Sequence, residues 1–428
     1  MNQFSVSLWG DEAWAATLAV KPYLKIIQIV ARDTSPPLYY LCLHTWMKIF
    51  GTSEIAIRSL SFLFFLGTVL TVFFIGKHLW DKKTGFFAAL LTLTNPFLFI
   101  YGFEGRMYAL LLLTSTLSVY FFLKKNRLAF ILATTAALYS HHFSIFVIFW
   151  EGLWTLGKNW GKPAKEVIKS LTDFFIIGLL YLPWLYPLYY QTSLVGSGFW
   201  LGKPIPYTLW ETTRKFLIGT GEGNWQQFAL WAIVAVLILR RWWEDKKNSV
   251  FLVGWFFTPL IITFLISQFF QPIFFDRYML MAIPASSLLF ASVRRKPSLV
   301  FILTIVLCLT AVNYDYFFHP VKRPFRELAS FVKEEASDLT LINYNAAAHH
   351  LWESKYYSLQ APIYTPEPLP FYTGTALMEK GDTIQKLPDE EEIGLITSAS
   401  PEEVEIPGYL VKKAKQFDSL WFLWLSKF

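Results

Sequence analysis

Long apolar runs separated by short polar or charged stretches dominate the chain from residue 55 to residue 314. A helix needs about 20 mostly apolar residues to cross a bilayer, and charged residues, glycines or prolines bound each run. The pattern predicts ten membrane segments, and several are short enough that we expect tilted, broken or protein-buried spans. The segments lie near 55–77, 85–101, 107–123, 128–140, 143–157, 170–190, 226–241, 249–270, 279–293 and 298–314.

The first 54 residues contain no run that is long and apolar enough to span a membrane. Residues 11–21 and 22–32 predict two short helices, with Pro22 at the break between them. Residues 36–50 are rich in aromatic side chains, and we expect them to lie at the membrane surface rather than to cross it.

From Asp315 the chain has the composition of a soluble domain, because Asp, Glu and Lys become frequent and prolines separate short segments. We expect a small α/β domain, with helices near 324–336 and 345–358 and strands near 339–342, 393–397, 408–416 and 420–426. The predicted regions are a first loop with juxtamembrane helices (1–54), a helical membrane domain (55–314) and this α/β domain (315–428).

The composition supports a polytopic membrane protein. Of the 428 residues, 54% are hydrophobic and 16% are charged, whereas soluble domains are about 25% charged. Cys42 and Cys308 lie in apolar stretches and indicate no disulfide framework. The net charge of +7 comes from basic residues interleaved between apolar runs. Membrane topology explains such a distribution, so we expect no nucleic-acid partner.

The basic residues are distributed unequally between the two sides of the predicted segments. One set of alternate loops holds seventeen Lys and Arg residues, within 77–83, 124–127, 158–169, 240–247 and 294–296. The opposite short loops hold five: Arg106, Lys203, Arg214, Lys215 and Arg277. Because Lys and Arg are retained in cytoplasmic loops, the first loop and the C-terminal domain are predicted to be extracytoplasmic.

The residues that could carry chemistry begin in the first loop. Two adjacent carboxylates, Asp11 and Glu12, lie in LWGDEAW (8–14), and DTSPPLYY (33–40) follows. Arg58, in SEIAIRS (53–59), precedes the first long apolar run. This order resembles the first extracytoplasmic loop of the GT-C glycosyltransferases, in particular the bacterial branch related to protein O-mannosyltransferases and aminoarabinose transferases. The resemblance covers about residues 5–315 and implies a membrane all-α fold, a polytopic GT-C helical bundle.

The resemblance implies an inverting glycosyltransferase in the cell membrane. It would move a monosaccharide from a polyprenyl-phosphate carrier to a cell-envelope lipid, glycan or protein acceptor on the outer face. The alternative is a transporter or flippase of lipid-linked saccharides, which would place ionisable residues at helix midpoints and show paired half-repeats. No repeat is visible, and Glu151 and Asp173 lie near predicted cytoplasmic ends, where we expect them to be solvated.

Transfer from a phosphate carrier needs a base for the acceptor hydroxyl, because the phosphate leaves readily by itself. We assign this role to Asp11, with Glu12 orienting it or stabilising developing positive charge. A second carboxylate nucleophile, as in a retaining glycosidase, is then unnecessary. The structural alternative is that the acids cap a helix and complement its dipole.

Other candidates lie in the later outer loops. Arg106, in YGFEGRMY (101–108), could bind the donor phosphate through a bidentate guanidinium contact, or Glu104 and Arg106 could pin a short turn. Arg58 and Arg277 are further candidates for the phosphate, with interfacial anchoring as the alternative. Ser35 stands where aminoarabinose transferases have a Lys that meets the lipid phosphate.

Glu104, Tyr108, His141 and His142 are candidate substrate contacts. The histidine pair could instead form a polar turn at the headgroup level, and it lacks the spacing of a known metal site. Related transferases carry an Asp near Glu104, which leaves the metal unknown and a divalent cation an open question. No cofactor is assigned.

The C-terminal domain is rich in aromatic residues that could stack on sugar rings or form a core. They are Trp352, Tyr356, Tyr357, Phe371 and Tyr372. We expect the domain to adjust acceptor choice and to contain no catalytic residue. GT-C relatives have a membrane helix before the acidic loop, whereas seven residues precede Leu8 here. We therefore expect the native protein to begin upstream of Met1.

The charge asymmetry predicts the result of cysteine labelling in intact cells. Cysteines introduced at Asn126 and Asn248 should react with a membrane-impermeant reagent only after permeabilisation, and one at Ser337 should react without it. The reverse pattern would place the acidic pair in the cytoplasm.

Overall fold

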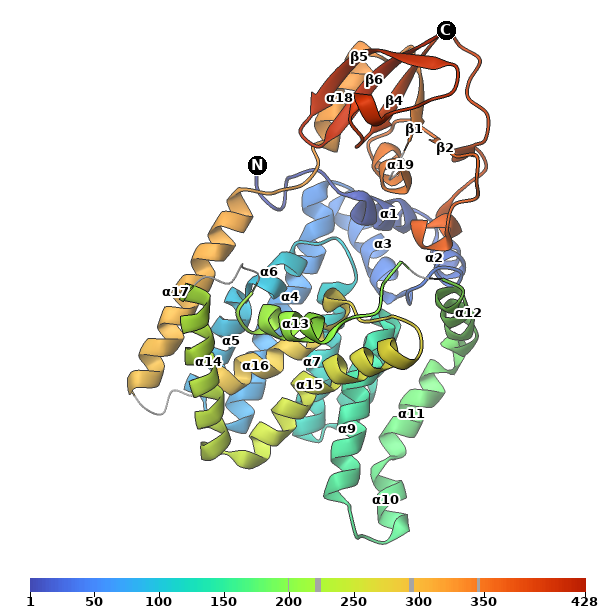
Figure 1. Cartoon of the computed structure of the whole chain (residues 1–428). Coiled ribbons are helices and arrows are strands. Elements are labelled where there is room, and N and C mark those ends of the chain that lie inside the picture. Colours follow the sequence, from blue (N-terminus) through green and yellow to red (C-terminus); the bar gives the residue numbers. More distant parts are fainter. Residues whose placement is uncertain (199, 220–224, 292–295, 345–346) are drawn as a thin grey trace. The chain divides into compact units, whose positions relative to one another are not determined.

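The computed structural model describes residues 1–198, 200–219, 225–291, 296–344 and 347–428. Its contacts divide it into two compact units (Figure 1). The helical unit comprises residues 35–39 and 58–317. The terminal unit comprises residues 1–34, 40–57 and 318–428, so it joins the first loop to the C-terminal domain in one body.

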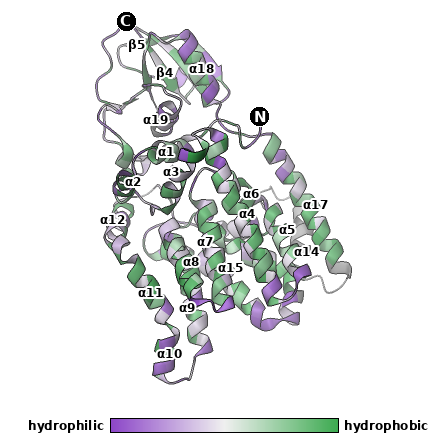
Figure 2. Ribbon diagram, turned by 180° about the vertical axis from the view of Figure 1, so that it is seen from behind, coloured by the Kyte–Doolittle hydropathy of each residue, from purple (hydrophilic) through white to green (hydrophobic). Residues whose placement is uncertain are grey.

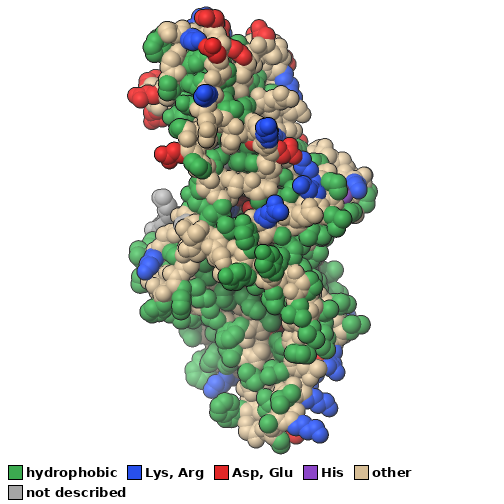
Figure 3. Space-filling model, turned by 90° about the vertical axis from the view of Figure 1, so that its right-hand side faces the viewer, with side chains coloured by type: hydrophobic (Ala, Val, Ile, Leu, Met, Phe, Trp, Pro, Cys, Tyr) green, Lys and Arg blue, Asp and Glu red, His purple; other side chains and the backbone are tan. Residues whose placement is uncertain are grey.

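The helical unit consists of helices that are predominantly hydrophobic along their length (Figure 2). Hydrophobic side chains also cover most of its face in the space-filling view, and Lys and Arg gather toward one end (Figure 3). Its α-helices are α4 (Glu54–Leu79), α5 (Lys82–Thr94), α6 (Pro96–Gly102), α7 (Tyr108–Lys124), α8 (Arg127–Ser140), α9 (Ile145–Lys158), α10 (Ala164–Ser170), α11 (Thr172–Tyr181), α12 (Leu185–Gly196), α13 (Pro206–Ile218), α14 (Trp225–Glu244), α15 (Lys246–Phe269), α16 (Ile283–Phe290) and α17 (Lys296–Phe318). Three 3₁₀ turns accompany them: η1 (His142–Ser144), η2 (Leu182–Trp184) and η3 (Asp276–Ala282).

Among the described residues, three helices are long and apolar enough to cross a membrane: α4, α15 and residues 299–318 of α17. The number rises to five if each of two bent helix pairs counts as one span. The chain is therefore a helical membrane protein, and its total of ten segments stays a prediction. The shorter apolar helices α7 and α8 match two of the predicted segments in position.

The predicted segment 85–101 is broken into α5 and α6, which meet at 66°. Asn95 lies at the break, where its side-chain oxygen accepts a hydrogen bond from the Leu98 N–H at 3.1 Å. Its amide nitrogen donates to the Phe216 carbonyl at 2.9 Å. Pro96 follows as the first residue of α6, a position where its missing N–H costs nothing. The predicted segment is therefore a broken helix, and whether it crosses the membrane stays a prediction.

Helix α16 lies in the core of the helical unit. All eight of its residues are buried, and it packs against α5, α13, α14 and α15. A helix that is apolar on every side is stable only where protein or lipid surrounds it completely. Because η3 leads directly into α16, the buried helix also anchors the segment that carries Asp276 and Arg277.

Helices α4 and α5 approach each other closely at two glycines. A Cβ atom on Gly85 would lie 2.5 Å from the Phe73 carbonyl oxygen, and one on Gly76 would lie 2.6 Å from the Gly85 Cα. Small residues allow membrane helices to pack backbone against backbone. The α4–α5 pair therefore depends on the absence of a side chain at these positions.

Glu151 and Asp173, the two acidic residues within predicted apolar segments, have different surroundings. Glu151 is fully buried and accepts hydrogen bonds from the Ser118 hydroxyl at 2.9 and 3.1 Å, so the expectation of interfacial solvation is wrong for this residue. The pairing of α7 with α8 and of α9 with α15 encloses this region. Asp173 forms an ion pair with the exposed Arg127 at 2.6 Å, near the surface.

The terminal unit contains a mixed six-stranded sheet in the order β3-β2-β1-β4-β6-β5. Strands β1 to β4 pair in parallel, and β6 is antiparallel to β4 and β5. The elements are α18 (Phe325–Glu335), β1 (Thr340–Asn343), α19 (Ala347–Tyr356), β2 (Ile363–Tyr364), β3 (Thr383–Ile384), β4 (Glu392–Thr397), β5 (Tyr409–Phe417), β6 (Leu420–Lys427), and the 3₁₀ turns η4 (Phe371–Thr373), η5 (Thr375–Leu377) and η6 (Pro401–Glu403). The predicted α/β domain is confirmed, and the two-residue strands β2 and β3 are additional.

Alternating side chains give the sheet two apolar faces. Leu341, Ile396 and Phe422 pack with α18 in one cluster, whereas their neighbours Ile342 and Leu395 belong to a second cluster. Burial on both faces is consistent with the adjacent Leu and Ile residues of β1 and β4.

The first loop forms α1 (Gly10–Ala19), α2 (Tyr23–Val30) and α3 (Leu38–Phe50). The two predicted short helices are present, and Pro22 precedes the first residue of α2. Helix α1 packs along α19 of the C-terminal domain (Figure 1). The acidic pair therefore lies on a helix that packs against another helix of the terminal unit, α19.

The close approach of α4 and α5 predicts a strong effect of one added methyl group. Gly85→Ala should lower the free energy of unfolding of the purified protein in detergent by about 1–3 kcal/mol, since the backbone must move to admit the Cβ. Gly152→Ala is the matched control, because a Cβ on Gly152 in α9 has no atom within 4 Å. It should be neutral or slightly stabilising. Equal melting temperatures for the two variants would contradict the packing argument.

Candidate functional site

Asp11 and Glu12 lie in the first turn of α1. The helix begins at Gly10 with Trp9 as its N-cap, so Asp11 does not cap it. Both acids still complement the partial positive charge of the helix N-terminus. Asp11 is partly exposed, whereas Glu12 is fully buried. The two adjacent carboxylates therefore have different environments.

The buried Glu12 forms an ion pair with Lys322. The Lys322 ammonium lies 2.8 Å from Glu12 Oε2, and the same oxygen accepts the Trp9 N–H at 3.4 Å. A buried carboxylate without a positive partner would be strongly destabilising. Lys322 therefore supplies a positive partner for Glu12 and fixes its orientation beside Asp11 in the helix.

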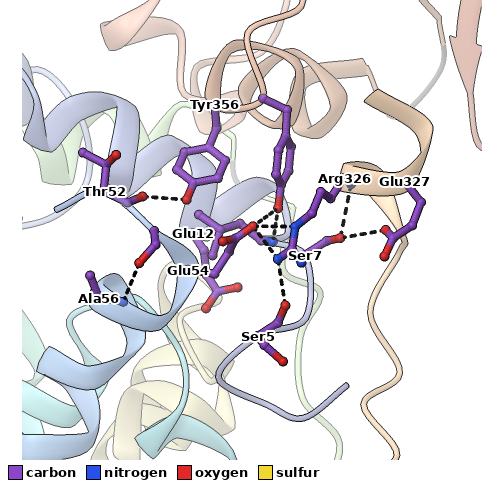
Figure 4. Close-up of polar contacts among 12 residues, drawn as sticks. Ser5, Ser7, Glu12, Thr52, Glu54, Ala56, Arg326, Glu327 and Tyr356 are labelled. Atoms are coloured by element: carbon purple, nitrogen blue, oxygen red, sulfur yellow. Dashed lines mark hydrogen bonds and ion pairs between the residues drawn. The ribbon is translucent and has the colours of Figure 1, made fainter. Parts of the chain in front are cut away.

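A second polar network ties the first loop to α18 (Figure 4). Arg326 donates to Glu54 Oε1 from Nε at 3.0 Å and from a terminal nitrogen at 2.5 Å. The same terminal nitrogen donates to the Ser5 carbonyl at 2.7 Å. Ser7 accepts the Arg326 backbone N–H at 3.2 Å and donates to Glu327 at 3.3 Å. Arg326 thus joins residues 5–7, the start of α4 and α18.

Buried titratable groups line α19. Burial raises the pKa of the Glu353 carboxyl to about 8, while the Arg323 charge and the Gly10 N–H lower it. Burial, together with the charges of Arg323 and His349, lowers the pKa of His350 to about 3. Arg323 lies 3.3 Å from His350 Nε2, which accepts its hydrogen bond as a neutral ring. Both groups favour their neutral forms at neutral pH.

The helical unit brings several predicted residues together around Arg277 in η3. Its guanidinium lies 4.0 Å from Oε1 of Glu104, in the turn between α6 and α7. It also lies over the rings of Tyr108 and Phe275, 5.4 and 4.7 Å from their centroids. Aromatic faces attract a guanidinium and restrict its movement. Glu104 thus has an ion-pair partner far away in the sequence.

Arg106 closes the short turn before α7. Its backbone N–H donates to the Glu104 carbonyl at 2.7 Å. The predicted turn at residues 104–106 is therefore present, and it is made by the backbone.

The loop that precedes η1 adds His141 to this region. His141 is buried, and its ring lies 5.0 Å from Tyr278 and 6.4 Å from Tyr108, between centroids. Tyr108 and Tyr278 stack at 6.2 Å. Next to Arg277, Asp276 pairs with Lys215 at 3.3 Å. We refer to Glu104, Tyr108, His141, Arg277 and Tyr278 as the arginine–aromatic cluster.

His142 has two side-chain partners. Its Nε2 lies 2.8 Å from Gln191 Oε1, an acceptor, so Nε2 carries the proton. Its Nδ1 then accepts from the Tyr181 hydroxyl at 3.1 Å. Gln191 continues the chain by donating to the Ser35 carbonyl at 3.3 Å. His142 could contact a substrate only by exchanging one of these partners.

Arg58 is fully buried in α4, at the first turns of the helix. A buried guanidinium needs compensating acceptors or anions. It follows directly after residue 57, where the chain passes from the terminal unit to the helical unit.

Sequence reasoning missed Lys322, Arg326, Glu54 and Glu353 as partners of the first loop. One signal was available: Lys322, Arg323 and Arg326 follow the last predicted segment on its outer side, where basic residues are disfavoured. Such residues call for a local partner, which the structure supplies as Glu12 and Glu54. Within the described ranges, no group of three or more His, Cys, Asp or Glu residues is arranged to hold a metal ion.

Comparisons with known proteins agree with the fold. Residues 34–186 match the model of the dolichyl-phosphate-mannose-protein mannosyltransferase family. No curated protein sequence gives a significant match. The crystal structure of apo ArnT from Cupriavidus metallidurans superposes with a TM-score of 0.68 at 12% identity, covering 98% of this chain and 94% of that one. ArnT from the same organism bound to undecaprenyl phosphate gives 0.63 at 12% identity, covering 99% and 95%.

The likeness to ArnT covers nearly the whole chain, including both the helices and the C-terminal sheet domain, and at this identity it shows the fold. The family match adds sequence evidence over the second part of the first loop and the first helices. Residues 34–186 of the chain are thus similar to the protein mannosyltransferases, and the whole chain has the fold of ArnT.

Proposed function

We propose that this protein is a membrane glycosyltransferase of the GT-C type, which takes a monosaccharide from a polyprenyl-phosphate carrier and transfers it with inversion. The observation that carries the proposal is the likeness, over nearly the whole chain, to an ArnT that binds undecaprenyl phosphate. The matched family is named for mannosyl transfer from dolichyl-phosphate mannose. Dolichyl phosphate and undecaprenyl phosphate are both polyprenyl-type phosphate carriers. Both comparisons support a lipid-linked phosphosugar as the donor.

The reaction needs one proton transfer and one displacement. The acceptor oxygen attacks the anomeric carbon as the bond from that carbon to the phosphate oxygen breaks. The acceptor proton passes to a carboxylate, and polyprenyl phosphate leaves with the electron pair. General-base assistance of this kind contributes about 10²–10⁴-fold.

Asp11 is the base in this proposal, and Glu12 is its orienting neighbour. The ion pair of Glu12 with Lys322 supports this division, because the buried Glu12 carboxylate is already held by an ammonium at 2.8 Å. Asp11 is partly exposed, which a base that must meet a substrate hydroxyl requires. The resemblance to the acidic pair of GT-C transferases points to the same residue.

Arg58, Arg106 and Arg277 bind the donor phosphate in this proposal. Negative charge grows on the phosphate as the bond to the sugar breaks, so fixed cations lower the barrier. The contacts of Arg277 with Glu104 and two aromatic rings support such a role, since they restrict the guanidinium before the donor binds. Glu104, Tyr108, His141 and His142 are proposed as further substrate contacts.

The acceptor is proposed to be a cell-envelope lipid, glycan or protein on the outer face of the membrane. The strong bias of Lys and Arg toward one set of loops supports this orientation. Incubation of membranes with a panel of radiolabelled polyprenyl-phosphate sugars, followed by identification of the labelled product, would reveal donor and acceptor together.

The base assignment predicts that Asp11→Asn lowers kcat by about 10²–10⁴-fold, with expression and donor binding unchanged. The amide keeps the size of the side chain but cannot take the acceptor proton. Asp173→Asn is the control, because this acid pairs with Arg127 near the surface of the helical unit. Turnover by purified Asp11→Asn at the wild-type rate would return Asp11 to a structural role.

The phosphate assignment predicts that Arg277→Gln lowers kcat/KM for the donor by about 10²–10³-fold. Arg277→Lys should recover little, since an ammonium lacks the planar fork that fits both phosphate and ring faces. Arg127→Gln serves as the control for loss of a paired arginine elsewhere in the unit. A kcat/KM within threefold of the wild type for Arg277→Gln would leave interfacial anchoring as its role.

A further inference from the structure

Backbone N–H groups at the start of α1 and just before it have no backbone acceptor within the helix. Three successive N–H groups, those of residues 8 to 10, each have a side chain as their partner. The Leu8 N–H donates to the Tyr357 hydroxyl at 2.9 Å, and the Trp9 N–H donates to Glu12 at 3.4 Å. The Gly10 N–H interacts with the Glu353 carboxyl and lowers its pKa. Two of the three acceptors therefore belong to the C-terminal domain, more than 340 residues away in the sequence.

Tyr357 is itself held in one orientation. Its hydroxyl donates to Glu54 Oε1 at 2.9 Å, so the lone pairs of the hydroxyl face the Leu8 N–H. Glu54 accepts from Arg326 as well (Figure 4). Burial and the Glu54 charge raise the pKa of Tyr357, which keeps the hydroxyl protonated as a donor. The position of residue 8 thus depends on a fixed chain of hydrogen bonds.

Gly10 packs closely against the side chain of His349 in α19. A Cβ atom at this position would lie 2.3 Å from the His349 Nδ1. Glu353, one helical turn after His349, is 1% exposed and reaches the Gly10 N–H from the same face of α19. Glycine immediately before Asp11 therefore lets α19 approach the start of α1.

The remaining length of α1 is also held. Trp14 donates from its indole nitrogen to the Gly374 carbonyl at 3.5 Å. At the far end, His44 of α3 donates from Nδ1 to the Ala19 carbonyl at 2.7 Å, and Lys21 pairs with Glu379 at 2.6 Å. Polar contacts that involve side chains therefore hold the helix at its N-terminus, in its middle and at its C-terminal end.

We propose that Tyr357 and Glu353 are positioning residues which hold the N-terminus of α1 and thereby aim Asp11 at the acceptor hydroxyl. This inference rests on the proposed function of Asp11. It gives the C-terminal domain a part in the chemical step, beyond the expected adjustment of acceptor choice, although neither residue touches substrate. A small displacement of a reacting group can cost about 10²-fold in rate.

The test compares two neighbouring tyrosines. Tyr357→Phe removes the acceptor of the Leu8 N–H, and Tyr356→Phe removes a hydroxyl that donates to the Thr52 carbonyl at 2.6 Å, away from α1. With full-length protein in detergent, Tyr357→Phe should lower kcat by about 10- to 100-fold, with the KM for the donor within twofold. Amide hydrogen exchange in residues 8–19 should become faster. Tyr356→Phe should leave both measurements unchanged.

Glu353 supplies an independent pair of variants. Glu353→Gln keeps an oxygen that can accept the Gly10 N–H and should retain most activity, whereas Glu353→Leu should resemble Tyr357→Phe. A general loss of domain stability would affect both substitutions alike and would also appear as faster exchange throughout residues 318–428. Rescue by the conservative variant therefore separates positioning from simple stability.

Two results would overturn the inference. In the first, Tyr357→Phe and Glu353→Leu match Tyr356→Phe in both kcat and exchange, which would show that α1 does not need these partners. In the second, α1 exchanges faster in Tyr357→Phe but kcat is unchanged, which would show that its N-terminus does not aim the base. If the wild type transfers no sugar from any polyprenyl-phosphate donor, the proposed function itself fails, and the exchange comparison reports on the hydrogen bonds alone.

Discussion

The carboxylate of Glu54 links three parts of the terminal unit that are far apart in the sequence. One of its oxygens accepts two hydrogen bonds from Arg326 and one from Tyr357. Hydrogen bonds to a charged group are shorter and stronger than neutral ones, and loss of the carboxylate would leave two donors without their acceptor. The first loop, the start of α4 and the C-terminal domain are joined at this point, so the placement of α1 depends on it.

Electrostatic compensation determines how the acids and bases of the terminal unit are used. Glu12 is buried, and Lys322 supplies the opposite charge. Glu353 and His350 are buried with shifted pKa values that favour their neutral forms. Asp11, by contrast, is partly exposed. These differences allow two neighbouring carboxylates of one helix to have separate roles.

In the helical unit, the charge of Arg277 is compensated in a similar way. Buried charges are tolerated only when they are paired or lie against polarisable groups, and Arg277 has both Glu104 and the faces of Tyr108 and Phe275. The anchoring of η3 by the fully buried α16 limits movement of this arginine relative to α6 and α7. A guanidinium restricted in this way loses little further freedom when it binds a phosphate.

The sequence by itself determined the class of protein and most of its elements. The apolar runs, the break at Pro22 and the short apolar stretches of β1 and β4 are local patterns. Such patterns reflect the 3.6 and 2.0 residue periods of helix and strand. The resemblance of the acidic loop to GT-C transferases came from short motifs as well. The partners of those motifs were decided by the tertiary structure. Lys322 for Glu12, Arg277 for Glu104, Tyr357 for Leu8 and the burial of Glu151 all involve residues on different elements. No periodicity in the chain encodes such pairs, because they arise only when packing brings distant segments within hydrogen-bonding distance.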